Sequence, residues 1–254
     1  MSIHPTFYFI AIASVMTGLI KEFFIFASVI FLHELGHMTM AYFYGWKIDK
    51  IVIYPFGGMT KFNELLNRPI QEEFWILVGG PLVQIIYMLT IFFFFHQGWI
   101  REPIYFLFRN YHTTILLFNL LPIIPLDGSK LVKLGLEKIL SYQVSYQTLL
   151  KLSWCMIIFL CFVVLVGSLD INFLMMLLIL TYQVLEAERQ KPILFHKFLL
   201  ERFLYVFSFP KRKQIKGLDV TKMSRDTKHI FQTPEKTYTE REILRKLFDT
   251  TRLF

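Results

Sequence analysis

Cysteine is scarce in this chain, which has only two among its 254 residues. Both of them, Cys155 and Cys161, lie in one apolar run, and two cysteines placed in this way make neither a disulfide framework nor a cysteine metal site. We interpret them as small apolar residues. Residues 1–20 also lack the basic start and the small-residue cleavage site of a secretory signal peptide, so we expect no cleaved leader.

Charge is also scarce over most of the chain, and long apolar runs take its place. Hydrophobic residues make up 55% of the sequence, and the mean hydropathy is +0.49. We therefore predict an α-helical polytopic membrane protein with about six transmembrane helices. The apolar runs cover approximately 5–20, 23–44, 74–96, 103–122, 152–168 and 171–185.

The basic residues are concentrated at one end. Residues 189–254 hold 16 Lys and Arg against 7 Asp and Glu, a net of +9, whereas residues 1–188 net −1. If this tail is cytoplasmic, the loops on its side carry eight Lys or Arg residues against three on the other, as the positive-inside rule requires. The cytoplasmic set is Lys47, Lys50, Lys61, Arg68, Lys130, Lys133, Lys138 and Lys151, and the outside set is Lys21, Arg101 and Arg109.

The partner of the basic tail follows from how its charges are spread. They are scattered and form no nucleic-acid motif, so we expect no direct contact with nucleic acid. The lipid bilayer, through anionic headgroups, or an acidic protein partner is the expected counterpart. One strand near 217–221 and one amphipathic helix near 240–248 are the expected elements of the tail.

The sequence His-Glu-Leu-Gly-His at 33–37 lies in the middle of the apolar run 23–44. His33 and His37 share one helix face and can bind one zinc ion, and Glu34 between them can activate a water molecule. At about 1.5 Å per residue the motif begins roughly 15 Å into the run, near the bilayer centre. Ionisable groups are costly there and rarely incidental, so a metal-dependent hydrolase acting inside the membrane is favoured over a chance match.

A third metal ligand is expected from the end of a later run. A catalytic zinc site needs three protein ligands and one open position. Residues 119–128 contain two prolines and a glycine, which break the helix near membrane depth, and such a break is tolerated where the backbone lines a site. Asp127 is therefore the natural third ligand beside His33 and His37; without them it would be an ordinary loop carboxylate.

The segment after the histidine motif is too short to span the membrane. The β-branched residues 51–53 and the Pro-Phe-Gly-Gly sequence at 55–58 predict a short β-hairpin or re-entrant loop. We interpret it as an edge strand that pairs with an extended peptide substrate near Val52 and Phe56. A simple connector is the alternative.

Taken together, these motifs resemble the site-2 protease family of intramembrane zinc metalloproteases. The resemblance is carried by residues 33–37, by Gly80-Pro81 and by N-x-x-P-x-x-P-L-D-G at 119–128, and it extends over about 1–205. It implies a catalytic core of three helices and a bound Zn²⁺ ion. In that core His33, His37 and Asp127 would bind the metal, Glu34 would be the general base, and Asn119 and Pro125 would contact the substrate.

Within the family the resemblance is closer to members that act in endospore formation. It implies a membrane-associated substrate, the pro-form of a late mother-cell sigma factor, and regulatory membrane proteins that hold the protease inactive. The implied location is the mother-cell membrane around the forespore. We divide the chain into a transmembrane metalloprotease domain at 1–188 and a cytoplasmic region at 189–254, which is long enough only for a truncated CBS-like module.

Two other functions fit parts of the sequence. Membrane metallopeptidases of the prenyl-protein-processing kind also carry H-E-x-x-H, but they need a glutamate on a later helix as third ligand, and no later run carries one at its middle. A non-catalytic membrane scaffold with a vestigial metal site is the other alternative. It leaves unexplained why the histidines, Glu34 and Asp127 are all present.

Overall fold

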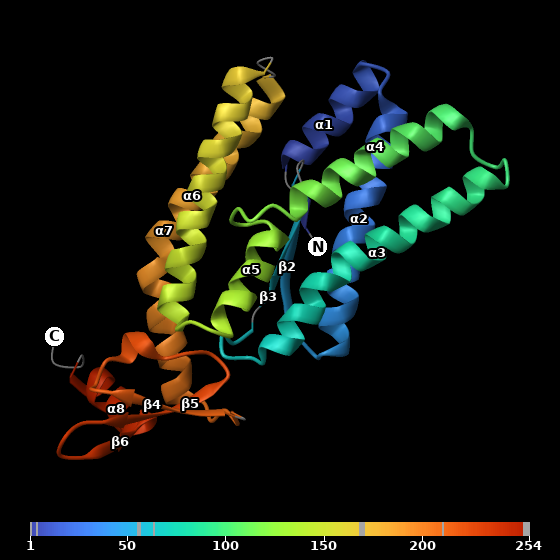
Figure 1. The fold of residues 1–254 in the computed structure, drawn as a ribbon. Coiled ribbons are helices and arrows are strands. Elements are labelled where there is room, and N and C mark those ends of the chain that lie inside the picture. Colours follow the sequence, from blue (N-terminus) through green and yellow to red (C-terminus); the bar gives the residue numbers. More distant parts are fainter. Residues whose placement is uncertain are drawn as a thin grey trace. The chain divides into compact units, whose positions relative to one another are not determined.

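The computed structural model describes residues 2–3, 5–54, 57–62, 64–167, 171–209 and 211–250, and it describes side chains there except at 2–10, 48–62, 171–172 and 250. The chain forms two compact units (Figure 1). The first unit contains residues 1–64 and 71–121, and the second contains 65–70 and 122–254. Each unit is described separately.

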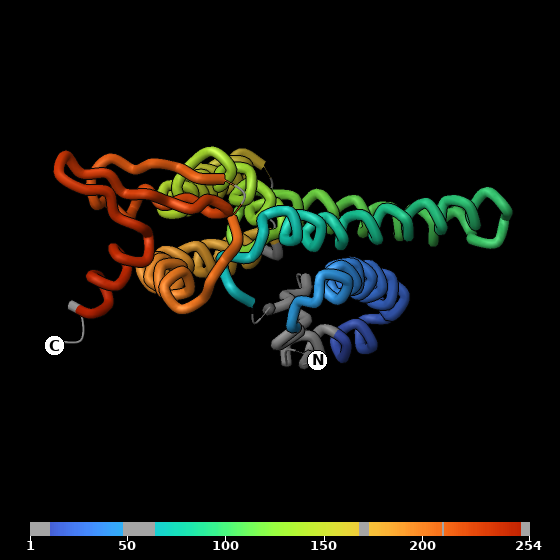
Figure 2. Tube along the Cα trace, turned by 90° about the horizontal axis from the view of Figure 1, so that it is seen from below, coloured from blue at the N-terminus to red at the C-terminus, as the bar shows by residue number. Residues whose placement is uncertain are grey.

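The first unit is built on four helices: α1 (Pro5–Met16), α2 (Ile20–Phe43), α3 (Ile70–His96) and α4 (Glu102–Asn119). Each coincides with one of the first four predicted apolar runs. Apolar residues hold α2 against its neighbours, with Val29 and Ile30 of α2 buried in one cluster with Phe108 and Ile115 of α4. Figures 1 and 2 show α3 and α4 running side by side in opposite directions.

A small sheet follows α2 in the same unit. Its strands β2 (Ile48–Tyr54) and β3 (Gly57–Phe62) pair antiparallel, in the segment for which the sequence predicted a short β-hairpin or re-entrant loop. Strand β1 (Ser2–Ile3) pairs with the other side of β2, so that Val52 lies opposite both Ser2 and Met59. The prediction that Val52 offers a free strand edge is therefore wrong, because β1 occupies that edge. Phe56 lies outside the described residues.

The larger segment of the second unit begins at residue 122, shortly after the end of α4. The helices α5 (Asp127–Glu137), α6 (Tyr142–Val166) and α7 (Ile171–Leu204) follow, so the break predicted for 119–128 falls between α4 and α5. Helices α6 and α7 lie side by side and antiparallel (Figure 1). α7 continues without interruption through residue 188, where the sequence suggested a domain boundary.

The C-terminal module consists of β4 (Lys211–Lys216), the 3₁₀ turn η1 (Val220–Lys222), β5 (Thr227–Gln232), β6 (Thr237–Thr239) and α8 (Glu240–Thr250). The amphipathic helix predicted near 240–248 is confirmed. The strand predicted near 217–221 is wrong, because the side chain of Asp219 accepts a hydrogen bond from the Thr221 N–H and begins the turn η1 instead. Buried Phe198 of α7, Phe231 of β5 and Leu244 of α8 join the module to the helix pair.

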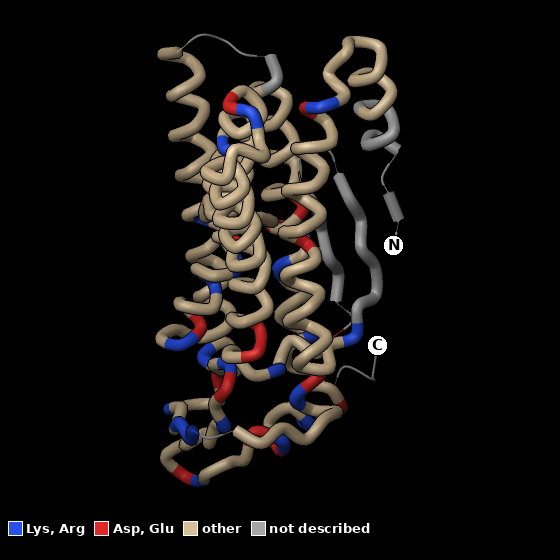
Figure 3. Tube along the Cα trace, turned by 90° about the vertical axis from the view of Figure 1, so that its right-hand side faces the viewer, with Lys and Arg blue, Asp and Glu red and all other residues tan. Residues whose placement is uncertain are grey.

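Three of the described helices, α2, α3 and α6, are long and apolar enough to cross a membrane. On α6 the large side chains of Ile158, Phe159 and Phe162 are more than half exposed, which suits a surface in contact with lipid and not with water. Figure 3 shows charged residues gathered in the C-terminal module and at helix ends, with long stretches of helix carrying none. These features are those of a membrane protein.

Candidate metal centre

Helix α2 brings together the three polar residues of the histidine motif. His33 and His37 are one helical turn apart and, like Glu34, are buried, with 1%, 5% and 6% of their surfaces exposed. One ligand atom from each residue lies within 4.8 Å of the others, so the group can hold a metal ion. Burying three such groups in an apolar helix is costly unless a partner compensates them.

The two imidazole rings face one another through Nε2. The Nε2 atoms of His33 and His37 are 3.1 Å apart. His37 Nδ1 lies 2.8 Å from the carbonyl oxygen of Ile76 in α3, and because a carbonyl oxygen only accepts, His37 carries its proton on Nδ1. The lone pair of His37 Nε2 is therefore directed toward His33.

The geometry of the two nitrogens fits zinc. Two nitrogens bound at about 2.0–2.1 Å to one tetrahedral zinc ion lie about 3.3 Å apart. The observed Nε2–Nε2 separation of 3.1 Å is close to that value. Imidazole nitrogen and carboxylate oxygen are also the donors that zinc takes in catalytic sites, so these residues suit the metal chemically.

Three glycines let α2 and α3 approach at the level of the histidines. A side chain at Gly36 would collide with the backbone of Gly79, and one at Gly79 would come within 2.7 Å of the Gly36 carbonyl oxygen. A side chain at Gly80 would overlap the ring of His37. The absence of side chains at Gly36 and Gly79 thus allows α2 and α3 to lie close together, and Gly80 in addition provides the space that the His37 ring occupies.

Helix α4 delivers Asn119 to the same place. Asn119 is the last residue of α4, is buried, and its Nδ2 atom lies 3.4 Å from His33 Nε2. The structure therefore places this predicted site residue beside the histidines. Its role in contacting a substrate stays a prediction.

The other predicted residues belong elsewhere in the structure. Asp127 opens α5 in the second unit, where its carboxylate pairs with Lys130 Nζ at 2.9 Å. Pro125 lies in the segment between α4 and α5 of that unit. The proposed parts of Asp127 in the metal site and of Pro125 and Phe56 in substrate binding stay predictions.

Gln84 is a residue that the sequence reasoning missed. It lies on α3, is completely buried, and its Oε1 atom is 2.9 Å from His33 Nδ1. Its Nε2 atom donates to the carbonyl oxygen of His112 in α4 at 3.0 Å. A polar amide inside the mostly apolar run 74–96 was the available signal.

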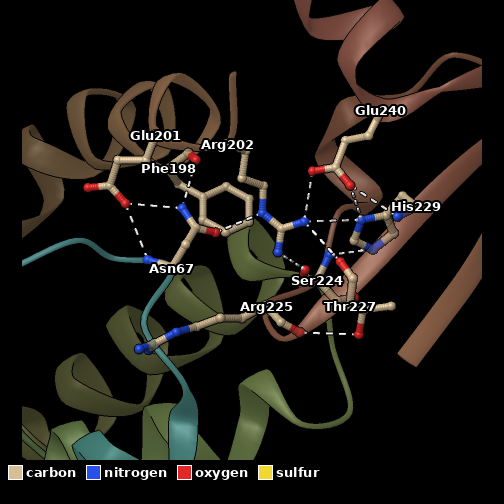
Figure 4. Close-up of polar contacts among 9 residues, drawn as sticks. All are labelled: Asn67, Phe198, Glu201, Arg202, Ser224, Arg225, Thr227, His229 and Glu240. Carbon is tan, nitrogen blue, oxygen red and sulfur yellow. Dashed lines mark hydrogen bonds and ion pairs between the residues drawn. The ribbon is translucent and has the colours of Figure 1, made fainter. Parts of the chain in front are cut away.

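A second group of buried polar residues holds the C-terminal module to α7 (Figure 4). The Arg202 guanidinium donates to Glu240 Oε1 at 2.9 Å, to Asn67 Oδ1 at 2.7 Å and to the carbonyl oxygen of Ser224 at 2.7 Å. It donates also to the carbonyl oxygen of Thr227 at 2.9 Å. Segment 65–70, the end of α7 and the module are thereby fixed to one another.

The electrostatics of this group set its protonation. Burial lowers the pKa of His229, whose Nε2 atom accepts a hydrogen bond from the Ser224 N–H at 3.1 Å. Burial alone would raise the pKa of Glu240, but its hydrogen bonds with His229 and the charge of Arg202 outweigh burial and hold that pKa below its usual value. The result is a neutral histidine beside an ionised Glu240–Arg202 pair.

Three comparisons with known proteins place the chain in context. Residues 22–105, which contain the histidine motif, Gly80 and Gln84, match Peptidase family M50. Stage IV sporulation protein FB of Bacillus subtilis (strain 168) is 35% identical over 202 residues, covering 79% of this chain and 70% of that protein. A zinc metalloprotease of Methanocaldococcus jannaschii is 34% identical over 121 residues, covering 46% of this chain and 34% of that protein.

A solved structure also resembles this one. The site-2 protease from Methanocaldococcus jannaschii superposes with a TM-score of 0.56 and 22% identity, covering 82% of this chain and 94% of that chain. At this identity the likeness concerns the fold.

Proposed function

This chain belongs to the site-2 protease family of zinc metalloproteases, Peptidase family M50, and we propose that it cleaves a membrane-associated protein substrate, the pro-form of a sporulation sigma factor. The activity itself is that of an intramembrane metalloprotease. Family membership also separates the chain from membrane metallopeptidases of the prenyl-protein-processing kind. Support for a sporulation substrate comes from the Bacillus subtilis relative, which aligns over most of both chains.

The observation that carries the proposal is the pair of imidazoles whose Nε2 atoms lie 3.1 Å apart beside a buried glutamate. In our proposal His33 and His37 hold zinc together with Asp127, which arrives from the break after α4. Zinc, when bound, polarises a carbonyl oxygen and lowers the pKa of water at the site. Glu34 takes the proton from the attacking water and gives it to the leaving amine as the peptide bond breaks.

The remaining residues are proposed to hold the substrate. Asn119 lies next to His33 and presents an amide that can hydrogen-bond a substrate backbone. Pro125 and Phe56 are the proposed further contacts. A peptide bond inside a substrate helix is hydrogen-bonded, so the target segment has to be extended before it is cleaved.

We further propose the topology and setting of the protease. The chain crosses the membrane six times, and the basic region 189–254, with its truncated CBS-like module, lies in the mother-cell cytoplasm. The loops with more Lys and Arg then lie on the cytoplasmic side. Regulatory membrane proteins that hold the enzyme inactive are part of the same proposal.

The topology is tested by cysteine labelling. In a cysteine-free background, single cysteines at Lys61 and Lys138 should resist labelling from outside, whereas one at Arg101 should react. The opposite pattern would reverse the orientation.

The decisive experiment is co-expression with a membrane-associated pro-sigma factor. The wild-type chain should convert the substrate to a shorter form, and the Glu34→Gln variant, made at the same level, should not. A chelator that removes zinc should stop conversion by the purified enzyme, and added zinc should restore it. Conversion that persists with Glu34→Gln would reject Glu34 as the base, and no conversion by any form would reject this substrate.

A further inference from the structure

We infer that Gln84 is a positioning residue of the metal centre: its amide fixes His33 with the proton on Nδ1 and the lone pair on Nε2, directed at the metal position. The inference rests on the proposed function in so far as His33 is a zinc ligand. It concerns a residue outside the histidine motif and outside the motif that contains Asp127.

Gln84 is buried inside the first unit. None of its surface is exposed, and it lies on α3, one of the helices able to cross a membrane. A buried amide without hydrogen bonds costs several kcal/mol in such surroundings. Gln84 uses both ends of its amide, one toward α4 and one toward α2.

The hydrogen-bond partners of the Gln84 amide determine which of its ends faces which helix. Its Nε2 atom lies 3.0 Å from the carbonyl oxygen of His112, and a backbone carbonyl oxygen accepts hydrogen bonds but cannot donate them. The NH₂ end of Gln84 must therefore face His112. Because the opposite orientation would set two oxygens against each other, the Oε1 end has to face His33.

The orientation of the Gln84 amide determines which ring nitrogen of His33 carries the hydrogen. Gln84 Oε1 lies 2.9 Å from His33 Nδ1, and an amide oxygen only accepts. His33 Nδ1 must then carry the hydrogen, which leaves the lone pair of the neutral ring on Nε2. Asn119 Nδ2, a donor, lies 3.4 Å from that Nε2 atom, which agrees with an acceptor at this position.

The two histidines are oriented by different kinds of group, one by the backbone and one by a side chain. His37 is oriented by the carbonyl oxygen of Ile76, a backbone group that no side-chain substitution removes. His33 is oriented by the side chain of Gln84, so its tautomer depends on one replaceable residue. Hydrogen-bond partners behind metal-binding histidines typically change metal affinity about 10- to 100-fold when they are lost.

The same residue also connects three helices. Gln84 on α3 bonds the backbone of His112 on α4 and the ring of His33 on α2. His112 and Asn119 are seven residues apart on α4, two helical turns, so α4 holds Gln84 at one level and contacts His33 at another. The orientation of His33 is thereby tied to the packing of α4 against α2 and α3.

The experiment compares three variants of the full-length protein in detergent. Gln84→Met keeps the length of the side chain but removes the amide, Gln84→Asn keeps an amide that is too short to reach both partners, and Gln84→Glu keeps an acceptor for His33 Nδ1. Ile85→Met, on an exposed part of α3, controls for the presence of a methionine in this helix. Circular dichroism checks that each variant is helical.

Two measurements are made on each protein. Zinc affinity, from competition with a chromophoric chelator, should fall about 10- to 100-fold in Gln84→Met and Gln84→Asn and stay close to wild type in Ile85→Met. Gln84→Glu keeps the acceptor for His33 Nδ1 but sets an oxygen against the His112 carbonyl oxygen, so its zinc affinity should fall less than that of Gln84→Met. The ¹⁵N shifts of the His33 ring in zinc-free protein should show the Nδ1–H tautomer in wild type, Gln84→Glu and Ile85→Met, and a shift toward Nε2–H in Gln84→Met and Gln84→Asn.

The outcomes separate this inference from the proposed function. If His33→Ala binds zinc as tightly as wild type, the proposed metal site fails, and the tautomer measurement still decides whether Gln84 orients the ring. If Gln84→Met and Gln84→Asn keep the wild-type tautomer and zinc affinity while His33→Ala loses zinc, the metal site stands and the role of Gln84 is rejected.

Discussion

Two of the buried polar groups in the described part of the chain, the one around Arg202 and the one around His33, are organised in opposite ways. Around Arg202 in the second unit, each nitrogen of the guanidinium donates to an acceptor of the protein, and its charge is paired with that of Glu240. Around His33 in the first unit, the hydrogen bonds that the Nδ1–H groups of His33 and His37 donate direct the two Nε2 atoms at one another, 3.1 Å apart. Two lone pairs that face each other at this distance are stabilised by a proton or a metal cation between them.

This difference separates a polar group that stabilises the fold from one that serves chemistry. The Arg202 network satisfies itself, so removing a member should cost stability and leave the chemistry of the first unit unaffected. The histidine group depends on a cation, so removing a member should cost catalysis and leave the fold largely intact.

The largest effect is expected from Glu34→Gln. The amide keeps the size of the carboxylate but cannot accept a proton, so the rate of peptide-bond cleavage should fall by about 10²- to 10⁴-fold, the usual range for general acid–base catalysis. Zinc content and thermal stability should remain close to wild type. The rate is measured by substrate conversion and the zinc by metal analysis. Loss of stability in this variant would remove the distinction between the two polar groups.

The second prediction concerns Arg202→Met. Without Arg202 the buried carboxylate of Glu240 loses its paired charge, and breaking a buried ion pair in this way costs about 3–5 kcal/mol. The module should then unfold more readily, as seen by faster hydrogen exchange in β5 and by proteolysis after α7. Arg245→Met is the matched control, because Arg245 pairs with Asp249 on the exposed face of α8 and surface pairs contribute little. Equal protection in both variants would contradict the prediction.

The third prediction concerns the space around His37. Gly80→Ala places a methyl group against the His37 ring, and overpacking of this kind costs typically about 1–3 kcal/mol. Because the ring has to move, zinc should bind more weakly while the helices still form. Gly135→Ala in α5 is the control, since a side chain there meets nothing within 4 Å. Unchanged zinc affinity in Gly80→Ala would show that the His37 ring has room to adjust.

Features that depend on neighbouring residues could be predicted from the sequence. The four-residue spacing of His33 and His37 fixes a common helix face, two prolines end a helix, and the pattern at 240–248 gives an amphipathic helix. Each of these depends on steric and periodic properties within about ten residues. The structure agrees with all three.

Features that depend on distant residues could not. The pairing of Val52 with Ser2 joins segments fifty residues apart, and nothing near Val52 indicates it. Gln84 contacts His33 and His112 only when α2, α3 and α4 come together. The wrong prediction of a strand at 217–221 has a local cause. The side chain of Asp219 accepts a hydrogen bond from the Thr221 N–H and forms a turn, whereas the apolar residues next to Asp219 favoured a strand.

The smallest expected effect is a dependence of module stability on pH through His229. Burial lowers the pKa of His229 in the folded protein, whereas the unfolded chain has a pKa of about 6.5. Below that pH the unfolded chain binds a proton that the folded chain does not. The contribution of His229 to stability is therefore complete above about pH 6.5 and is lost as the pH falls toward the lowered folded pKa, at no more than about 1.4 kcal/mol per pH unit.

Hydrogen exchange in β5, measured at several pH values between 7 and 5 and corrected for the intrinsic exchange rate, should report this loss. In His229→Gln, which cannot titrate, protection should depend much less on pH over this range. His196→Gln, at an exposed position of α7, should behave like wild type. Glu240 contributes in a separate and more acidic range, because its pKa is lowered from about 4.5. If protection in β5 is the same at pH 7 and pH 5 in the wild type, His229 does not couple the module to pH.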